Sequence, residues 1–380
     1  MTRRALPTLA LSLALCLSLT ATAGAAGDFK LVGHSHMPLE YYQGVTHDDE
    51  GNVYFDGPFR GLYRTDTNLR EEARNGDVID PAAQSDPGFN HIGDITFDEA
   101  EGGRVILPLE CYQPGANPSN TCGIGGFGVA DPDSLTWKYW VKLDPADIPK
   151  AMWAETSPDG KLIWTSSGND LLAYNTADVS RANAQPASAD GPTIRPAKRV
   201  VGAVPAHGIT GAVFVGPRLF LAGQNGDNMQ VSSVDLTTGK ARPEIKETIS
   251  GESEGLDTFR GLGGSFHWMV MPIPQAGNPP TFERDKGSLL HYNARPTALE
   301  LVVTPRVASI GRKTRFAFRV TDNNGDPVKG ATVKFSHVRA RTDARGRAKV
   351  TETLRAPGRY TAVATKKGLK TARAVVRSSR

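Results

Sequence analysis

Carboxylate, imidazole, amide and hydroxyl side chains recur just before five stretches that are typical of β-hairpins. They are Gln43, His91, Asp94, Glu155, His207, Thr210, Glu252, Glu254 and Asp257. Carboxylates that meet at one place repel one another unless they are protonated or neutralised by a cation. Because oxygen ligands suit Ca²⁺, we predict that calcium is held by Glu155, Glu252, Glu254 and Asp257. The alternative is that these carboxylates only accept hydrogen bonds from backbone amides and water.

Other members of this set suit ligand binding or proton transfer. Hydrogen-bond donors and acceptors are offered by Gln43, His91, Asp94 and Thr210, which we predict to bind a ligand. The candidate general bases are His91, His207 and Glu155. They would serve a hydrolase of lactones or esters in which the metal ion polarises the carbonyl. A purely structural role is the alternative for each histidine.

A repeated hairpin positions these residues. Glycines that open the turns recur at intervals of 52, 57, 56 and 48 residues, at Gly51, Gly103, Gly160, Gly216 and Gly264. Each is followed by a β-branched, aromatic or aliphatic run, and the interval is the length of a four-stranded blade. The sequence therefore predicts an all-β fold with a five-bladed β-propeller, six blades being the alternative. A strand at 29–32 would complete the last blade and close the ring. Because the inner strands of a propeller surround a central channel, we predict that the ligand binds at the mouth of that channel.

Two turns carry a resemblance to known proteins. Ser157-Pro158-Asp159-Gly160-Lys161 and the segment 48–54 resemble turns of secreted bacterial propellers, a group with lactonase-like, YncE-like and strictosidine-synthase-like members. The resemblance covers residues 28–295 and implies the fold rather than a function. The run 252–257 resembles the acidic segment of metal-binding propellers, although no pair of asparagines completes such a cage.

The C-terminal part of the chain differs sharply in charge. Residues 297–380 contain 20 Lys and Arg against 5 Asp and Glu, whereas the preceding part has 24 against 35. Six short runs of alternating apolar and polar residues predict strands of a β-sandwich. The segments 323–327 and 328–333 resemble turns of bacterial Ig-like and carboxypeptidase-regulatory-like modules, and this implies a non-catalytic spacer or adhesion module.

This charge predicts a partner class. We expect the basic segment to bind an anionic cell-wall polymer or glycan. A basic face that only keeps the module soluble is the alternative. We do not expect nucleic acid, because no aromatic residues alternate with the cations.

The N-terminus predicts export. Arg3 and Arg4 precede an apolar run at 5–19, and Ala23-Gly24-Ala25 offers a cleavage site. The run is short for a membrane span, which needs about 20 residues, so an uncleaved anchor is the less favoured alternative. We predict a signal peptide at 1–26, a propeller at 27–295 and a basic Ig-like sandwich at 296–380. The mature protein would be secreted, without a membrane span, and associated with the cell wall through its basic module.

Two cysteines remain after the predicted cleavage. Cys111 and Cys122 flank a loop rich in Pro, Asn and Gly, and an oxidising compartment favours a disulfide between them. Two free thiols that bind a metal are the alternative.

Overall fold

The structure is a computed structural model, and it describes residues 29–113, 116, 119–185, 189–206, 208–272, 287–294, 296, 298–322 and 325–379. The predicted signal peptide and His207 lie outside the described residues. The fold is all-β, and no helix in these ranges is both long and apolar enough to cross a membrane. The helices described are α1 (Pro81–Ser85) and the 3-10 helices η1 (Leu39–Tyr41), η2 (Ala100–Gly102), η3 (Thr176–Asp178) and η4 (Arg181–Asn183).

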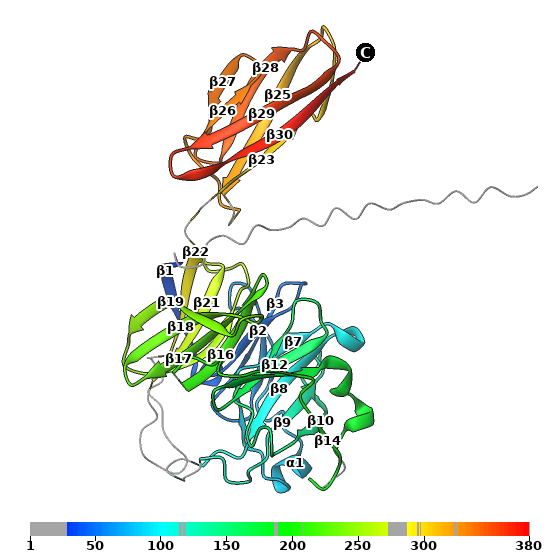
Figure 1. The fold of residues 1–380 in the computed structure, drawn as a ribbon, viewed down its shortest axis with the longest axis vertical. Coiled ribbons are helices and arrows are strands. Elements are labelled where there is room, and N and C mark those ends of the chain that lie inside the picture. The colour runs from blue at the N-terminus through cyan, green and yellow to red at the C-terminus, as the bar shows by residue number, and fades with distance from the viewer. Residues whose placement is uncertain are drawn as a thin grey trace, which may run out of the picture.

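The described part of residues 29–294 forms five sheets (Figure 1). The first contains β2 (Val45–His47), β3 (Asn52–Asp56), β4 (Leu62–Asp66) and β5 (Glu71–Asn75). The second contains β6 (His91–Ile92), β7 (Thr96–Asp98), β8 (Arg104–Glu110), β9 (Gly126–Ala130), β10 (Trp137–Leu143) and β14 (Thr193–Ile194). The third contains β11 (Glu155–Thr156), β12 (Leu162–Ser167), β13 (Asp170–Asn175) and β15 (Lys198–Val200).

The remaining two sheets complete this body. The fourth contains β16 (Gly208–Val215), β17 (Arg218–Asn225), β18 (Asn228–Asp235) and β19 (Lys240–Thr248). The fifth contains β20 (Glu252–Asp257), β21 (Phe266–Met271), β22 (Ser288–Ala294) and β1 (Phe29–His36). β1 pairs antiparallel with β22, so the predicted N-terminal strand joins the last sheet.

Apolar side chains hold the five sheets in a closed ring. Each pair of successive sheets buries a shared cluster, and the last cluster joins the fifth sheet back to the first through Met269 and Leu289 against Val53 and Phe55. The innermost strands β2, β7, β11, β16 and β20 contact one another in the same circular order. This arrangement is a β-propeller, in which the innermost strands surround a central channel.

The repeat found in the sequence corresponds to these sheets. The five predicted runs that follow the glycine turns are β3, β8, β12, β17 and β21. In the first turn, Gly51 has a φ of 95°, which suits glycine, and the Asp48 carboxylate accepts the backbone N–H groups of Glu50 and Asn52. The sequence thus encodes each hairpin locally, and the apolar strands on both sides supply the shared clusters.

Residues 299–379 form two further sheets in the described ranges. One contains β23 (Leu299–Thr304), β25 (Lys313–Asp322) and β28 (Arg347–Thr353). The other contains, in spatial order, β24 (Val307–Ser309), β30 (Leu369–Ser379), β29 (Gly358–Lys366), β26 (Thr332–Phe335) and β27 (Val338–Arg341). Both sheets contribute to one core, with Phe316 and Phe318 of β25 packed against Phe335 of β26. The alternation predicted for this segment places apolar residues in that core.

Candidate functional site

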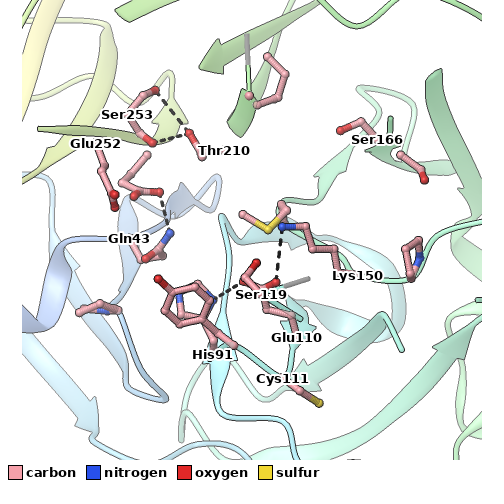
Figure 2. A pocket seen from close by; sticks show the side chains of 18 of the residues that line it. Gln43, His91, Glu110, Cys111, Ser119, Lys150, Ser166, Thr210, Glu252 and Ser253 are labelled. Atoms are coloured by element: carbon pink, nitrogen blue, oxygen red, sulfur yellow. Dashed lines mark hydrogen bonds and ion pairs between the residues drawn. The ribbon is translucent and has the colours of Figure 1, made fainter. Parts of the chain in front are cut away.

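A cavity of about 1100 Å³ opens where the innermost strands begin. Strands of four sheets and loops beside the first sheet contribute to its walls, through residues such as Gln43, His91, Met152, Thr210 and Glu252. Figure 2 shows the labelled lining side chains arranged around a common space, with Gln43 and His91 on one side and Lys150 on another. The cavity therefore lies at the mouth of the central channel, where the sequence predicted a site.

The predicted residues divide into two groups. Five of them line the cavity: Gln43, His91, Thr210, Glu252 and Glu254. Asp94, Glu155 and Asp257 do not line it. Since His207 lies outside the described residues, its prediction stays untested.

Asp94 connects four sheets at the centre of the ring. Its side chain is completely buried, and its carboxylate accepts the N–H of Val45 at 3.1 Å, of Ala212 at 2.9 Å and of Leu256 at 3.5 Å. Burial raises the pKa of Asp94 well above its usual range. A side chain at Gly255 would collide with the Asp94 carboxylate, so glycine allows the strands to approach this closely. Asp94 acts here as a bond between blades and does not face the cavity.

Glu155 and Asp257 lie away from the cavity. Glu155 accepts the N–H of Phe214 at 2.8 Å and the hydroxyl of Thr96 at 3.0 Å. Burial raises its pKa to about 8, and the carboxylate of Asp257 adds to the shift. Asp257 pairs with Nδ1 of His47 at 2.8 Å, and this carboxylate raises the pKa of His47 to about 9.

A short contact between Gln43 and Glu254 lies at the cavity wall. The Gln43 Nε2 donates to Glu254 Oε2 at 2.6 Å, and both side chains are almost fully buried. Burial raises the pKa of Glu254 well above its usual range, with Glu252 adding to the shift, so the protonated form is favoured. The Oε1 of Gln43 is buried and has no hydrogen-bond partner among the described residues. This acceptor lies in a side chain that lines the cavity, where a ligand could satisfy it.

His91 and Glu110 form a second polar pair. The Nδ1 of His91 lies 3.2 Å from Glu110 Oε1, and the Lys150 ammonium lies 3.9 Å from Glu110 Oε2 (Figure 2). Burial alone would raise the pKa of Glu110, but the contacts with His91 and Lys150 outweigh it and lower that pKa. The ring of Tyr112 lies 5.2 Å from that of His91. A carboxylate behind an imidazole fixes the orientation of the ring, as in catalytic dyads and binding sites alike.

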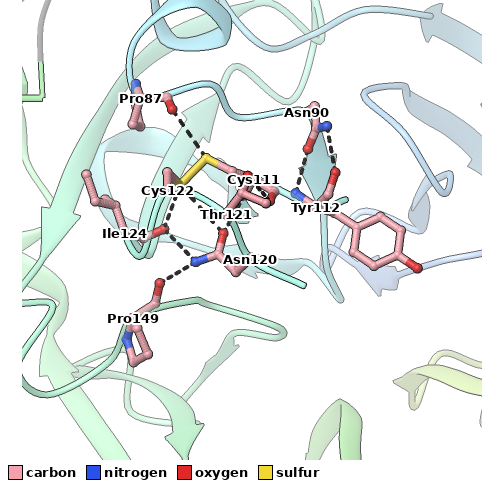
Figure 3. Close-up of a disulfide and its surroundings, with 9 residues drawn as sticks. All are labelled: Pro87, Asn90, Cys111, Tyr112, Asn120, Thr121, Cys122, Ile124 and Pro149. Atoms are coloured by element: carbon pink, nitrogen blue, oxygen red, sulfur yellow. Dashed lines mark hydrogen bonds between the residues drawn. A yellow bond between two sulfur atoms is a disulfide. The ribbon is translucent and has the colours of Figure 1, made fainter. Parts of the chain in front are cut away.

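The predicted disulfide is confirmed and fixes one wall. Cys111 and Cys122 are bonded, with their Cα atoms 5.7 Å apart (Figure 3). The Oδ1 of Asn120 accepts the N–H of Cys111 at 2.7 Å, and Asn90 exchanges two hydrogen bonds with the backbone of Tyr112. These bonds hold both ends of the loop, where Tyr112, Ser119 and Thr121 line the cavity.

The four predicted calcium ligands are not gathered at one point. Glu252 and Glu254 line the cavity, whereas Glu155 and Asp257 make the contacts described above with Phe214, Thr96 and His47. In the part of the chain that the structure describes, no three His, Cys, Asp or Glu side chains are placed to hold a metal ion together. The residues therefore do not fit a single calcium cage.

The lining residues that the sequence analysis did not predict include Glu110, Lys150 and Tyr112. The predicted residues precede the hairpins, whereas Glu110 ends β8, the strand that pairs with both β6 and β7. One signal was present, since Glu110 is the sole carboxylate in the apolar run 105–110 and directly precedes Cys111.

Comparison with known proteins adds only structural likeness. No protein-family model and no curated protein matches the chain. Similar solved structures include a luciferin-regenerating enzyme at 12% identity, covering 70% of this chain and 95% of that chain with a TM-score of 0.35. They also include a glucose dehydrogenase (11% identity, 69% and 98% covered, TM-score 0.36) and the Dos1 propeller (12%, 66% and 66%, TM-score 0.30). At these TM-scores the likeness carries no argument about function.

Proposed function

We propose that the protein binds a neutral, hydroxyl-rich small molecule, of the saccharide class, in the cavity at its channel mouth. The observation that carries the proposal is the buried Gln43 Oε1, an acceptor without a partner among the described residues, in a side chain that lines the cavity. Buried acceptors are almost always satisfied, so a donor on a ligand or a bound water is expected there.

The charges around the cavity favour a neutral ligand. The Lys150 ammonium offsets the charge of Glu110, and Glu254 has a strongly raised pKa that favours its uncharged form. Gln43, Thr210 and the protonated Glu254 supply both donors and acceptors. The apolar side chains of Phe59, Ile209 and Met271 also line the cavity, and they suit the apolar faces of a sugar ring.

A calorimetric titration with a panel of neutral mono- and disaccharides tests this function. Gln43→Met removes both polar atoms at similar volume and should weaken binding about tenfold, the effect of losing one hydrogen bond of ~1.4 kcal/mol. The matched control is Gln230→Met in β18, whose side chain bonds to Ser232 outside the cavity. Failure of every saccharide to bind, or unchanged affinity in Gln43→Met, would overturn the proposal.

Calcium binding is tested separately from the saccharide proposal. The predicted ion stays a prediction, and the positions of its four ligands give it no support as one cage. Repeating the titration with added calcium, on the protein and on Glu254→Gln, decides whether Glu252 and Glu254 bind the ion with a ligand.

A second candidate is hydrolysis of a lactone or ester. One observation favours it, the His91–Glu110 pair at 3.2 Å, because the carboxylate would orient His91 as a general base. Turnover of simple lactones that is lost in both His91→Gln and Glu110→Gln would support a hydrolase. Retained turnover in these variants would exclude this pair as its base.

The architecture and location are proposed with the function. The five sheets with their five shared clusters support a five-bladed propeller, and the two sheets at 299–379 with one core support an Ig-like sandwich. We place the protein outside the cell, because its disulfide suits an oxidising compartment. Its basic sandwich would serve as an adhesion or spacer module at the cell envelope. The intact mass of the protein from the medium, beginning after residue 26, tests the export.

A further inference from the structure

The cations of the basic segment have a definite arrangement on the five-stranded sheet. One face of this sheet packs on the core through Val333, Ala362, Ala364 and Val376. The alternate positions on the opposite, exposed face carry Lys334, Arg339, Arg341, Arg359, Arg373 and Arg377. We call these six residues the basic face.

The basic face lacks compensating charge. Its other outward positions in β26, β27, β29 and β30 are occupied by Thr, Val and Ser, and none of the described ones is Asp or Glu. Within the described ranges, none of the six cations takes part in a recorded ion pair. Lys334 stands directly opposite Arg339, and Arg359 stands opposite Arg377. Like charges in these positions destabilise a sheet, so fold stability does not account for the arrangement.

The residue types indicate which anion suits this face. Five of the six cations are Arg, whose planar guanidinium binds phosphate oxygens in pairs. Arg339 and Arg341 are two residues apart on β27, a distance of about 6.7 Å along a strand. No aromatic side chain occupies a described outward position of the face, so bases would find no stacking partner. The pattern suits phosphates repeated along a flexible chain.

We propose that the basic face binds a linear phosphodiester polymer without bases, of the kind found in cell walls. This inference rests on the adhesion role proposed above and assigns it to one of two exposed sheet faces. It is independent of the ligand proposed for the cavity. The other outward face, on β23, β25 and β28, also carries cations, including Arg315, Arg319 and Lys349, but they share it with Glu300.

Two triple variants with equal charge loss provide the test. The first is Lys334→Gln, Arg339→Gln, Arg373→Gln, which removes three cations from the basic face. The control is Arg315→Gln, Arg319→Gln, Lys349→Gln, which removes three from the opposite sheet. All six positions are exposed, so both variants should fold. Binding of the full chain to immobilised poly(glycerol phosphate) is measured over a series of salt concentrations, with double-stranded DNA of equal phosphate content as a comparison.

We expect the two triple variants to lose affinity for the polymer to different extents. The first variant should bind at least tenfold more weakly, with a shallower dependence on salt because fewer counterions are released. The control should stay within threefold of the unchanged protein. Equal weakening in both variants would overturn the assignment to this face while leaving the adhesion role intact. Absence of binding by the unchanged protein would overturn both, and tighter binding to DNA would overturn the proposed polymer.

Discussion

Replacing Glu155 by Gln should make the stability of the propeller less sensitive to pH. Burial raises the pKa of this carboxyl to about 8 in the folded protein, whereas an unfolded Glu titrates near its ordinary value of about 4.3. The folded state therefore holds the proton more tightly. Stability falls as pH rises from the unfolded value through about 8 and then levels off. Gln resembles the protonated acid and removes this loss.

The expected size follows from the same shift. A pKa difference between about 4.3 and about 8 corresponds to a ceiling of about 5 kcal/mol at pH 8. Because the Glu155 side chain is partly accessible to solvent, water weakens the effect, and we expect about 2 kcal/mol. At pH 5 the two proteins should differ by less than ~1 kcal/mol. Gln can still accept the N–H of Phe214 and can donate its amide hydrogen to Thr96, so the local hydrogen bonds are kept.

Urea unfolding followed by tryptophan fluorescence measures this difference. All five Trp residues lie between 137 and 268, so the signal reports the propeller and not the C-terminal sheets. His47 has a pKa of about 9 when folded, so it keeps its proton throughout the range of pH 5 to 8. Glu50→Gln, at an exposed position, is the matched control and should follow the unchanged protein. A stability difference that is the same at pH 5 and pH 8 would refute the reasoning.

Three further predictions concern other parts of the propeller. His47→Gln should lower stability at pH 6, where the ion pair with Asp257 is fully formed, but not above pH 10. The reason is that the raised pKa of folded His47 contributes stability that is lost as pH passes about 9. Thermal unfolding at both pH values checks this. Asp94→Ala should be less stable than Asp94→Asn by about 2 kcal/mol in urea unfolding, because Asn retains an acceptor for one N–H; equal stabilities would contradict it. The double variant Cys111→Ser, Cys122→Ser should lose about 3 kcal/mol of stability and bind the cavity ligand more weakly, and an unchanged affinity would show that the loop does not shape the site.

The hairpins could be predicted from the sequence because their signals are local. Each glycine turn is followed by its strand within a few residues, and the structure has a strand at all five places, such as β12 after Gly160. The disulfide was predictable for the same reason, since its two cysteines are 11 residues apart. The neighbours of each innermost strand come from distant parts of the chain, so the contacts in the channel were not predictable.

Which distant groups the carboxylates of β20 contact was also beyond the sequence. β20 contains Glu252, Glu254 and Asp257, which a regular alternation cannot place on one face. The pairing of β20 with β21 shifts between Ser253 and Leu256. The first two carboxylates line the cavity, while Asp257 reaches His47. Register shifts of this kind depend on the packed sheets.

Carboxylates inside the channel accept hydrogen bonds from backbone amides, which was the alternative to calcium binding. An innermost strand has no partner on its channel side, so its N–H groups there need other acceptors. Asp94 accepts from Val45 and Ala212, and Glu155 accepts from Phe214. These carboxylates already accept backbone hydrogen bonds that hold the fold together, so they are not available to a ligand. Within the described residues, Glu252 and Glu254 at the mouth accept no backbone hydrogen bond from another sheet, and this supports the proposed ligand site at the mouth rather than inside the channel.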